Sequence, residues 1–198
     1  MKVLFLGPAD SLVLDLLKSA EGHVAQTMDP ITEESLHRMQ VDFLVSHGFR
    51  HILRPDVLNR FPRRAVNLHI SYLPWNRGAD PNLWSFLENT PKGVSIHYLD
   101  AGIDTGDVIA QKLVEFEASE TLRSSYARLQ AEIASLFAEH WSRIRTGSCG
   151  AAKQAGAGSF HRVADREKVV HLLTNGWDTP VADLEKAGAE WRRSQGLA

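Results

Sequence analysis

The chain has 198 residues, a formal net charge of -2 and a sequence pI of about 6.5. With 43% hydrophobic and 23% charged residues, it has the composition of a globular protein, long enough for one domain with a small C-terminal appendage. This charge balance excludes general nucleic-acid binding, and the apolar runs are too short for a secretory signal or a membrane span. The single cysteine, Cys149, excludes an internal disulfide, so we expect a cytoplasmic protein. Nothing near Cys149 in the sequence resembles a catalytic base for it.

The first third of the chain alternates between short apolar runs and amphipathic stretches. Asp10 or Ser11 is placed to cap a first helix, Thr32 a second, and Pro55 suits the first turn of a third. This rhythm predicts an α/β, Rossmann-like fold, in which an open, mostly parallel twisted sheet carries helices on both faces. The expected strands cover residues 3–7, 23–28, 43–46 and 66–69, and the expected helices cover 11–20, 32–39 and 55–61.

The middle of the chain begins with residues 70–80, where proline, asparagine and glycine predict an irregular loop. A helix is expected over 82–89. Strands over 94–99 and 108–116 flank a segment rich in Asp and Gly, and their pairing across it would make the sheet mixed. Apolar residues at three- and four-residue spacing predict a long helix over 121–145 that covers the core.

The last fifty residues begin with a Gly- and Ala-rich stretch over 147–158, which predicts a linker. We therefore expect a main domain over residues 1–146 and a small helical appendage, packed on or beside it, over 147–198. Short helices are expected within this appendage over 165–174 and 181–194.

Ligands of open α/β sheets bind at the carboxyl ends of the strands, where this sequence places segments 46–53, 67–80 and 100–107. Asn67 and His69 are two residues apart, so their side chains share one face of a strand. An amide beside an imidazole suits the polarisation of an electrophile, and a carboxylate at Asp104 could orient the imidazole. Spacing alone leaves a structural role for this polar group open.

Two longer motifs surround these residues. The first is Asn-Leu-His-Ile-Ser-Tyr-Leu-Pro-Trp-Asn-Arg-Gly-Ala-Asp from Asn67, and the second is Val-Ser-Ile-His-Tyr-Leu-Asp-Ala-Gly-Ile-Asp-Thr-Gly-Asp from Val94. Together they resemble the catalytic core of the folate-dependent formyltransferases, whose pattern is Asn-x-His-Pro-Ser-x-Leu-Pro followed by an Asp-x-Gly loop. Ile70 stands where much of that family has proline, which removes no catalytic group. The resemblance covers roughly residues 1–145 and, more loosely, the Gly-Ser-Phe-His-Arg segment from Gly158.

This resemblance implies transfer of a formyl group from 10-formyltetrahydrofolate to a primary amine, without a metal. Asn67 and protonated His69 would stabilise the oxyanion, while Asp104 would keep His69 charged and help to move the proton of the amine. A metal pair of His47 and His51 is disfavoured, because no third ligand has matching spacing. The resemblance also implies that backbone groups bind the pterin, and the predicted cofactor-binding residues are Arg50, His51, Ile52, Leu53, Leu99, Asp100, Ala101, Gly102 and Ile103. His97 is expected to be a core or edge residue.

The loop from Leu73 to Asn82 resembles that of enzymes that formylate amino-dideoxy sugars carried on a nucleoside diphosphate. Trp75 would stack on a sugar or base, and Arg77 would either meet a pyrophosphate or pair with Asp80. The expected partner is therefore a small-molecule amine, with no nucleic acid and no membrane, and a homodimer is compatible with this function. The predicted substrate-binding residues are Ser71, Trp75, Arg77, Gly78 and Asp80.

Other readings of the family resemblance stay open. A glycinamide ribonucleotide formyltransferase binds its substrate phosphate after the first strand, where Pro8 and Asp10 disfavour an anion here. Methionyl-tRNA formyltransferases carry an additional C-terminal domain, so we expect a different acceptor. A formyltetrahydrofolate hydrolase and an inactive folate-binding homologue are the remaining alternatives.

Overall fold

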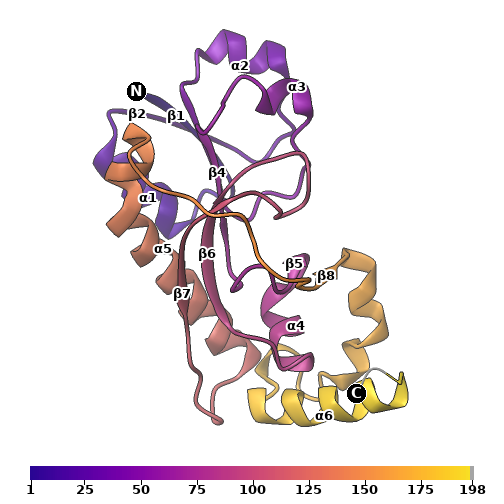
Figure 1. The fold of residues 1–198 in the computed structure, drawn as a ribbon. Coiled ribbons are helices and arrows are strands. Elements are labelled where there is room, and N and C mark those ends of the chain that lie inside the picture. Colours follow the sequence, from indigo (N-terminus) through magenta and orange to yellow (C-terminus); the bar gives the residue numbers. More distant parts are fainter. Residues whose placement is uncertain (197–198) are drawn as a thin grey trace. The chain divides into compact units, whose positions relative to one another are not determined.

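The computed structural model describes residues 1–196 and has the mixed, mostly parallel sheet with helices that the sequence predicts (Figure 1). Its strands are β1 (Lys2–Leu6), β2 (His23–Thr27), β3 (Phe43–Ser46), β4 (Ala65–His69), β5 (Arg77–Gly78), β6 (Gly93–Tyr98), β7 (Val108–Leu113) and β8 (Phe160–His161). Its α-helices are α1 (Leu12–Ala20), α2 (Glu33–Met39), α3 (Pro55–Leu58), α4 (Pro81–Leu87), α5 (Leu122–Thr146) and α6 (Val181–Ser194). Short 3-10 helices are η1 (Val163–Lys168), η2 (Val170–Leu172) and η3 (Gly176–Asp178).

The main sheet has six strands in the order β2-β1-β3-β4-β6-β7. β1 pairs in parallel with β2 and with β3, and β3 pairs in parallel with β4. β4 and β6 are antiparallel, so the sheet changes direction at β4. The mixed sheet expected from the sequence is confirmed. The change from parallel to antiparallel pairing occurs at β4, the strand that carries Asn67 and His69.

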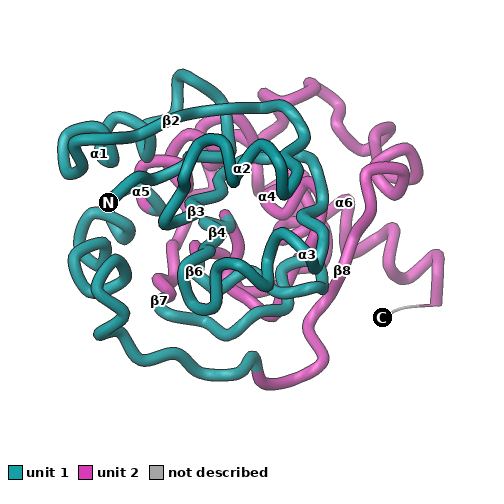
Figure 2. Tube along the Cα trace, turned by 90° about the horizontal axis from the view of Figure 1, so that it is seen from above, with its two compact units in different colours: residues 1–69, 95–110, 133–154 teal, residues 70–94, 111–132, 155–198 magenta. Residues whose placement is uncertain are grey.

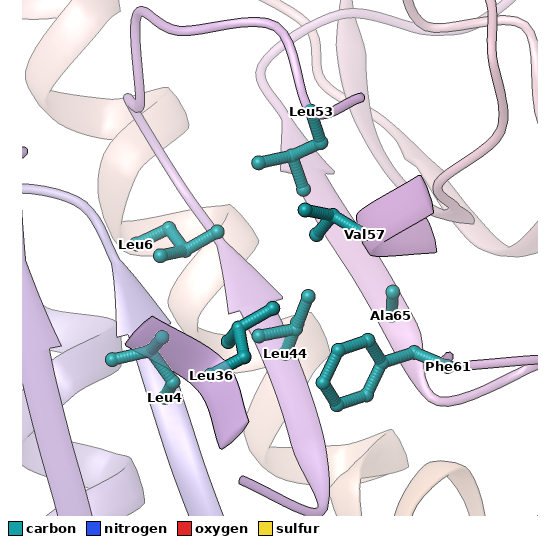
Figure 3. Packing of buried hydrophobic residues seen from close by; sticks show 8 residues of the cluster. All are labelled: Leu4, Leu6, Leu36, Leu44, Leu53, Val57, Phe61 and Ala65. Atoms are coloured by element: carbon teal, nitrogen blue, oxygen red, sulfur yellow. The ribbon is translucent and has the colours of Figure 1, made fainter. Parts of the chain in front are cut away.

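Helices cover both faces of the parallel strands, as predicted. On one face Leu4 of β1 and Leu44 of β3 pack with Leu36 of α2 and Val57 of α3 (Figure 3). Because side chains alternate along a strand, Phe43 points to the opposite face. There its ring meets the ring of Trp141 of α5 edge to face, with 5.2 Å between centroids.

Several predicted helix starts are confirmed at atomic detail. The Ser11 side chain accepts a hydrogen bond from the backbone N–H of Val13 at the start of α1. Thr32 caps α2 by accepting from the backbone N–H of Ser35 at 3.2 Å. Each side chain satisfies an amide that lacks a partner within its helix, which is why these residue types mark helix starts.

The α-helix predicted over residues 165–174 is wrong, because η1 and η2 occupy this region. Between them Val169 has φ -125° and ψ -5°, outside the helical range, and its side chain is fully buried in an apolar cluster. The helix is interrupted at Val169 because burying this β-branched side chain stabilises the fold more than a continuous helix would. The predicted loop over 70–80 also contains a short strand, β5, which pairs in parallel with β8.

The chain forms two compact units, each assembled from separate segments (Figure 2). Unit 1 comprises residues 1–69, 95–110 and 133–154, and unit 2 comprises 70–94, 111–132 and 155–198. The core of unit 2 joins α4 to α6 through Leu83, Leu87, Val181 and Leu184. The division into domains at residues 1–146 and 147–198 stays a prediction. Among the described residues, no helix is both long and apolar enough to span a membrane.

Candidate active site

Two of the predicted catalytic side chains lie on β4 in unit 1, close to its carboxyl end. In the antiparallel pair with β6, Asn67 lies opposite His97 and His69 lies opposite Ser95. Asn67 is half-buried, whereas His69 is 7% and His97 1% exposed. The pairing therefore gathers an amide and two imidazoles on neighbouring strands, and both imidazoles are largely shielded from solvent.

Asp104 reaches the same group of side chains from the loop that follows β6. Its Oδ1 accepts a hydrogen bond from Asn67 Nδ2 at 3.0 Å. Its Oδ2 lies 3.7 Å from Nδ1 of His69, and the Asp104 side chain is only 12% exposed. The structure thus brings Asn67, His69 and Asp104 together.

His97 is a member of this polar cluster that the sequence analysis missed. Its Nε2 lies 3.4 Å from Asp104 Oδ1 and 3.2 Å from Asn67 Nδ2. Its Nδ1 lies 2.8 Å from the carbonyl oxygen of Tyr98, which can only accept, so Nδ1 carries a hydrogen. Neutral His97 can therefore accept from Asn67 through Nε2, and protonated His97 can donate to Asp104. The strand register that places His97 opposite Asn67 reveals this position, and that register exists only once the sheet is formed.

Residues of the loop that carries Asp104 contribute to holding its shape. Asp100 Oδ1 accepts from the backbone N–H of Gly102 at 3.1 Å and from Thr105 Oγ1 at 2.7 Å. Gly106 lies so close to β6 that a Cβ there would be 1.8 Å from the Tyr98 carbonyl oxygen. Asp104 itself has φ 53°, a left-handed conformation that residues other than glycine rarely adopt. The position of the carboxylate is therefore determined by backbone geometry.

The two segments predicted to bind the pterin both belong to unit 1. Leu53 is buried in the apolar cluster of β1, β3, α2 and α3, and Leu99 packs against that cluster. The residues beside them, 50–52 and 100–103, are exposed. Each segment is thus fixed by a leucine in the same core, next to residues that are exposed. Such backbone donors and acceptors fit the flat, polar edge of a pterin.

A second set of contacts in unit 1 surrounds Tyr98. The guanidinium of Arg63 lies over the Tyr98 ring at 4.5 Å, and the Tyr98 hydroxyl lies 3.3 Å from the sulfur of Cys149. Burial raises the pKa of Tyr98 to about 12, and the hydrogen bond with Cys149 adds to this effect. The phenol therefore stays protonated at neutral pH.

The loop predicted to bind the acceptor follows His69 in the chain and belongs to unit 2. Ser71 is buried, and its hydroxyl donates to the Trp75 carbonyl at 2.7 Å. Asn76 is fully buried; its Nδ2 donates to Thr90 Oγ1 at 2.8 Å and its N–H donates to Ser159 Oγ at 2.9 Å. Ser71 and Asn76 therefore stabilise the conformation of the loop through these hydrogen bonds.

The remaining predicted acceptor residues lie around the β5–β8 pair. Gly78 has φ 86°, and a Cβ there would be 2.3 Å from the His161 carbonyl oxygen, so this position requires glycine. Asp80 lies 3.7 Å from Arg166. Trp75 and Arg77 are half-buried. The segment from Gly158, which resembles the family only loosely, contains β8. Through β8 it pairs with β5 of the loop that is predicted to bind the acceptor.

His47 lies in unit 1 and takes part in the strand framework. It is buried, and its Nδ1 donates to the carbonyl of Leu68 at 2.9 Å, which connects the end of β3 to β4. Within residues 1–196, no group of three or more His, Cys, Asp or Glu side chains is arranged to hold a metal ion.

Comparison with known proteins places these motifs in one family. The formyl transferase family model matches residues 8–140, a span that contains the polar cluster. The chain is 50% identical, with a TM-score of 0.89, to the formyltransferase PseJ from Anoxybacillus kamchatkensis, solved in complex with UDP-4,6-dideoxy-4-formamido-L-AltNAc and tetrahydrofolate. That comparison covers 94% of this chain and 100% of the PseJ chain.

Curated relatives share a shorter part of the chain. The dTDP-4-amino-4,6-dideoxyglucose formyltransferase of Mycobacterium bovis is 36% identical over 112 residues, which are 57% of this chain and 48% of that protein. A methionyl-tRNA formyltransferase of Synechococcus sp. is 33% identical over 146 residues, which are 72% of this chain and 44% of that protein. The chain spans about half the length of the curated relatives it matches. Because the family model matches more than half of the chain and includes Asn67, His69 and Asp104, this protein belongs to the formyl transferase family.

Proposed function

We propose that this protein transfers a formyl group from 10-formyltetrahydrofolate to the amino group of a nucleotide-linked amino-dideoxy sugar. The observation that carries the proposal is the cluster of Asn67, His69 and Asp104 in a chain that is 50% identical to PseJ over the whole PseJ chain. PseJ was solved with a formamido sugar on UDP and with tetrahydrofolate, which are the two products that such a reaction would give. The single cysteine fits a protein of the reducing cytoplasm.

The cluster supplies the groups that formyl transfer requires. The folate co-substrate supplies the activated formyl group. Asn67 and protonated His69 donate hydrogen bonds to the formyl oxygen, where negative charge develops as the amine attacks. Asp104 faces His69 and accepts the proton that the attacking amine releases, directly or through water. The bond between the formyl carbon and N10 of the folate then breaks, and this proton passes to N10 as tetrahydrofolate leaves. Asn67 Nδ2 donates to Asp104 Oδ1 in this structure and lies 3.2 Å from His97 Nε2, so its second hydrogen turns from His97 to the formyl oxygen when the substrate binds.

The folate would lie along the exposed backbone of residues 50–52 and 100–103. Leu53 and Leu99 anchor both segments in one apolar cluster, so the two loops are preorganised and lose little entropy on binding. The Asp100 carboxylate is engaged with Gly102 and Thr105, which suits a role in shaping the loop while backbone groups recognise the pterin.

The acceptor would be held by the loop from Ser71 to Asp80. Trp75 stacks on the sugar or base, and Arg77 meets the diphosphate as a planar, permanently charged donor. The likeness to PseJ supports a UDP-linked 4-amino-4,6-dideoxy sugar as the acceptor, because the ligand bound to PseJ is a UDP-linked 4-formamido-4,6-dideoxy sugar.

The test is a turnover screen in which release of tetrahydrofolate and formation of the formamide are measured together. The acceptors are 4-amino-4,6-dideoxy sugars linked to UDP, dTDP and GDP, with glycinamide ribonucleotide and methionyl-tRNA as competing acceptors. We expect coupled turnover with one or more sugar nucleotides, and highest kcat/KM with the UDP-linked sugar.

Three outcomes would contradict the proposal. Release of tetrahydrofolate that does not depend on an amine would identify a hydrolase. Transfer to glycinamide ribonucleotide or to methionyl-tRNA in preference to the sugars would change the acceptor class. Tight folate binding with no turnover on any amine would identify an inactive homologue.

A further inference from the structure

The segment after α5 in unit 1 is closely attached to the rest of that unit, although its composition predicts a linker. Val108 and Ala152 exchange two backbone hydrogen bonds of 2.8 and 2.9 Å. The Cys149 sulfur lies 3.3 Å from the Tyr98 hydroxyl, and its carbonyl accepts from Arg63 Nη2 at 3.5 Å. Residues 149–154 therefore form a strap, fixed to β7 and to the end of β6.

Gln154, the last residue of this strap, connects it to the loop that carries Asp104. Its half-buried side-chain amide donates from Nε2 to the carbonyl of Asp104 at 2.8 Å and to the carbonyl of Gly106 at 2.9 Å. Two carbonyls two residues apart thus converge on one nitrogen, whose two hydrogens can serve both. A side-chain amide suits such a pair of acceptors, because it supplies two N–H donors and carries no charge.

The carbonyls that accept from Gln154 belong to the part of the loop with an unfavourable backbone conformation. Asp104 has φ 53°, in the left-handed region disfavoured for side chains with a Cβ. Asp100 stabilises the loop from Gly102 to Thr105, and the Gly106 backbone packs against Tyr98. Gln154 adds the contacts to the backbone of Asp104 itself. Without them the peptide would be free to relax, and the carboxylate would move relative to His69, 3.7 Å away.

We propose that Gln154 is a positioning residue for formyl transfer, which holds the backbone of the Asp104 loop so that the carboxylate stays within reach of His69 and Asn67. Its effect on turnover rests on the proposed function, whereas its effect on the loop does not. Gln154 would therefore support the catalytic apparatus of unit 1 from a segment that follows the long helix α5.

The first measurement compares Gln154→Met with the wild type. Methionine has a similar length and volume and no charge, but it has no N–H to donate. We expect kcat to fall about 10- to 100-fold, because small misplacements of a catalytic group have effects of this size. KM for both substrates and the melting temperature should stay close to the wild-type values. Gln154→Asn, which keeps an amide on a shorter side chain, should recover part of the loss.

Lys153→Ala is the matched control, because Lys153 is the neighbouring, exposed residue of the same strap. It should leave kcat, both KM values and the melting temperature unchanged. An equal loss of kcat in Gln154→Met and Lys153→Ala would overturn the specific role of the Gln154 amide. So would a change confined to KM.

The second measurement is amide hydrogen exchange of peptides that cover residues 100–107, and it needs no substrate. Gln154→Met should accelerate exchange in this loop and leave β1 to β4 unchanged. If the wild type has no formyltransferase activity, the proposed function fails. The exchange experiment would still show whether Gln154 holds the backbone of the Asp104 loop. Wild-type exchange rates in Gln154→Met, or a kcat equal to that of an active wild type, would overturn the inference.

Discussion

Asp104 is the residue on which the polar cluster depends. Its two carboxylate oxygens face different partners, with Asn67 and His97 near Oδ1 and His69 near Oδ2. A single carboxylate therefore orients an amide and two imidazoles at once. In the proposed reaction, this one carboxylate would both orient its neighbours and receive a proton from the amine.

We expect Asp104→Asn to lower kcat by at least about 10²-fold, because an amide neither stabilises a charged imidazole nor accepts a proton. The fold should persist, since asparagine preserves the size of the side chain and tolerates a left-handed backbone better than most residues. His69→Ala should cause a similar loss. Steady-state kinetics and circular dichroism of the purified variants measure these two effects.

Asp107→Asn is the control for this pair of variants, because it removes a carboxylate from the same loop. It should retain wild-type turnover. Turnover of Asp104→Asn within a few-fold of the wild type would remove Asp104 from the proposed mechanism, and a matching result for His69→Ala would remove the imidazole.

At the scale of elements, α1 and α5 are connected through one buried carboxylate. Glu21 is the C-cap of α1, and its side chain is 4% exposed. Its Oε1 accepts from Trp141 Nε1 at 3.1 Å and lies 3.1 Å from Arg145 Nε. Trp141 also packs against Phe43 of β3. The ion pair and the aromatic contact therefore fix this end of α5 against unit 1.

Glu21→Ala should destabilise the protein by about 1–3 kcal/mol, mainly because it leaves the buried Trp141 N–H without an acceptor. The Arg145 ion pair contributes less, since the Arg145 side chain is 41% exposed and screened by solvent. Urea unfolding followed by tryptophan fluorescence measures the difference. Glu139→Ala removes an exposed carboxylate from the same helix and should have no measurable effect. Equal unfolding midpoints for the wild type and Glu21→Ala would contradict this account.

The elements themselves could largely be predicted, because their signals are local. Apolar periodicity and the caps at Ser11 and Thr32 indicate where α1 and α2 begin. The prediction failed at residues 165–174, where burial of Val169 interrupts the helix. It also missed β5 and β8, since two-residue strands exist only through their pairing with one another.

At the scale of the whole molecule, a folate should stabilise the native state. Any ligand that binds only the folded protein raises its stability, by about 2.7 kcal/mol at a concentration of 100 Kd. We therefore expect 5-formyltetrahydrofolate, a stable analogue, to raise the melting temperature in differential scanning fluorimetry. The fragment p-aminobenzoylglutamate lacks the pterin and should have a much smaller effect. Equal shifts for the two compounds, or no shift at saturating analogue, would contradict the pterin site at residues 50–53 and 99–103.

The sequence by itself determined the fold class, the family, and the shared strand face of Asn67 and His69. These properties depend on local periodicity and on motifs that are continuous in the chain. Only the tertiary structure decided that His97 lies opposite Asn67, that Asp104 reaches both, and that Gln154 holds the backbone of Asp104. Such contacts join residues far apart in the sequence. They follow from strand register and from the path of the strap, neither of which leaves a local pattern of residues.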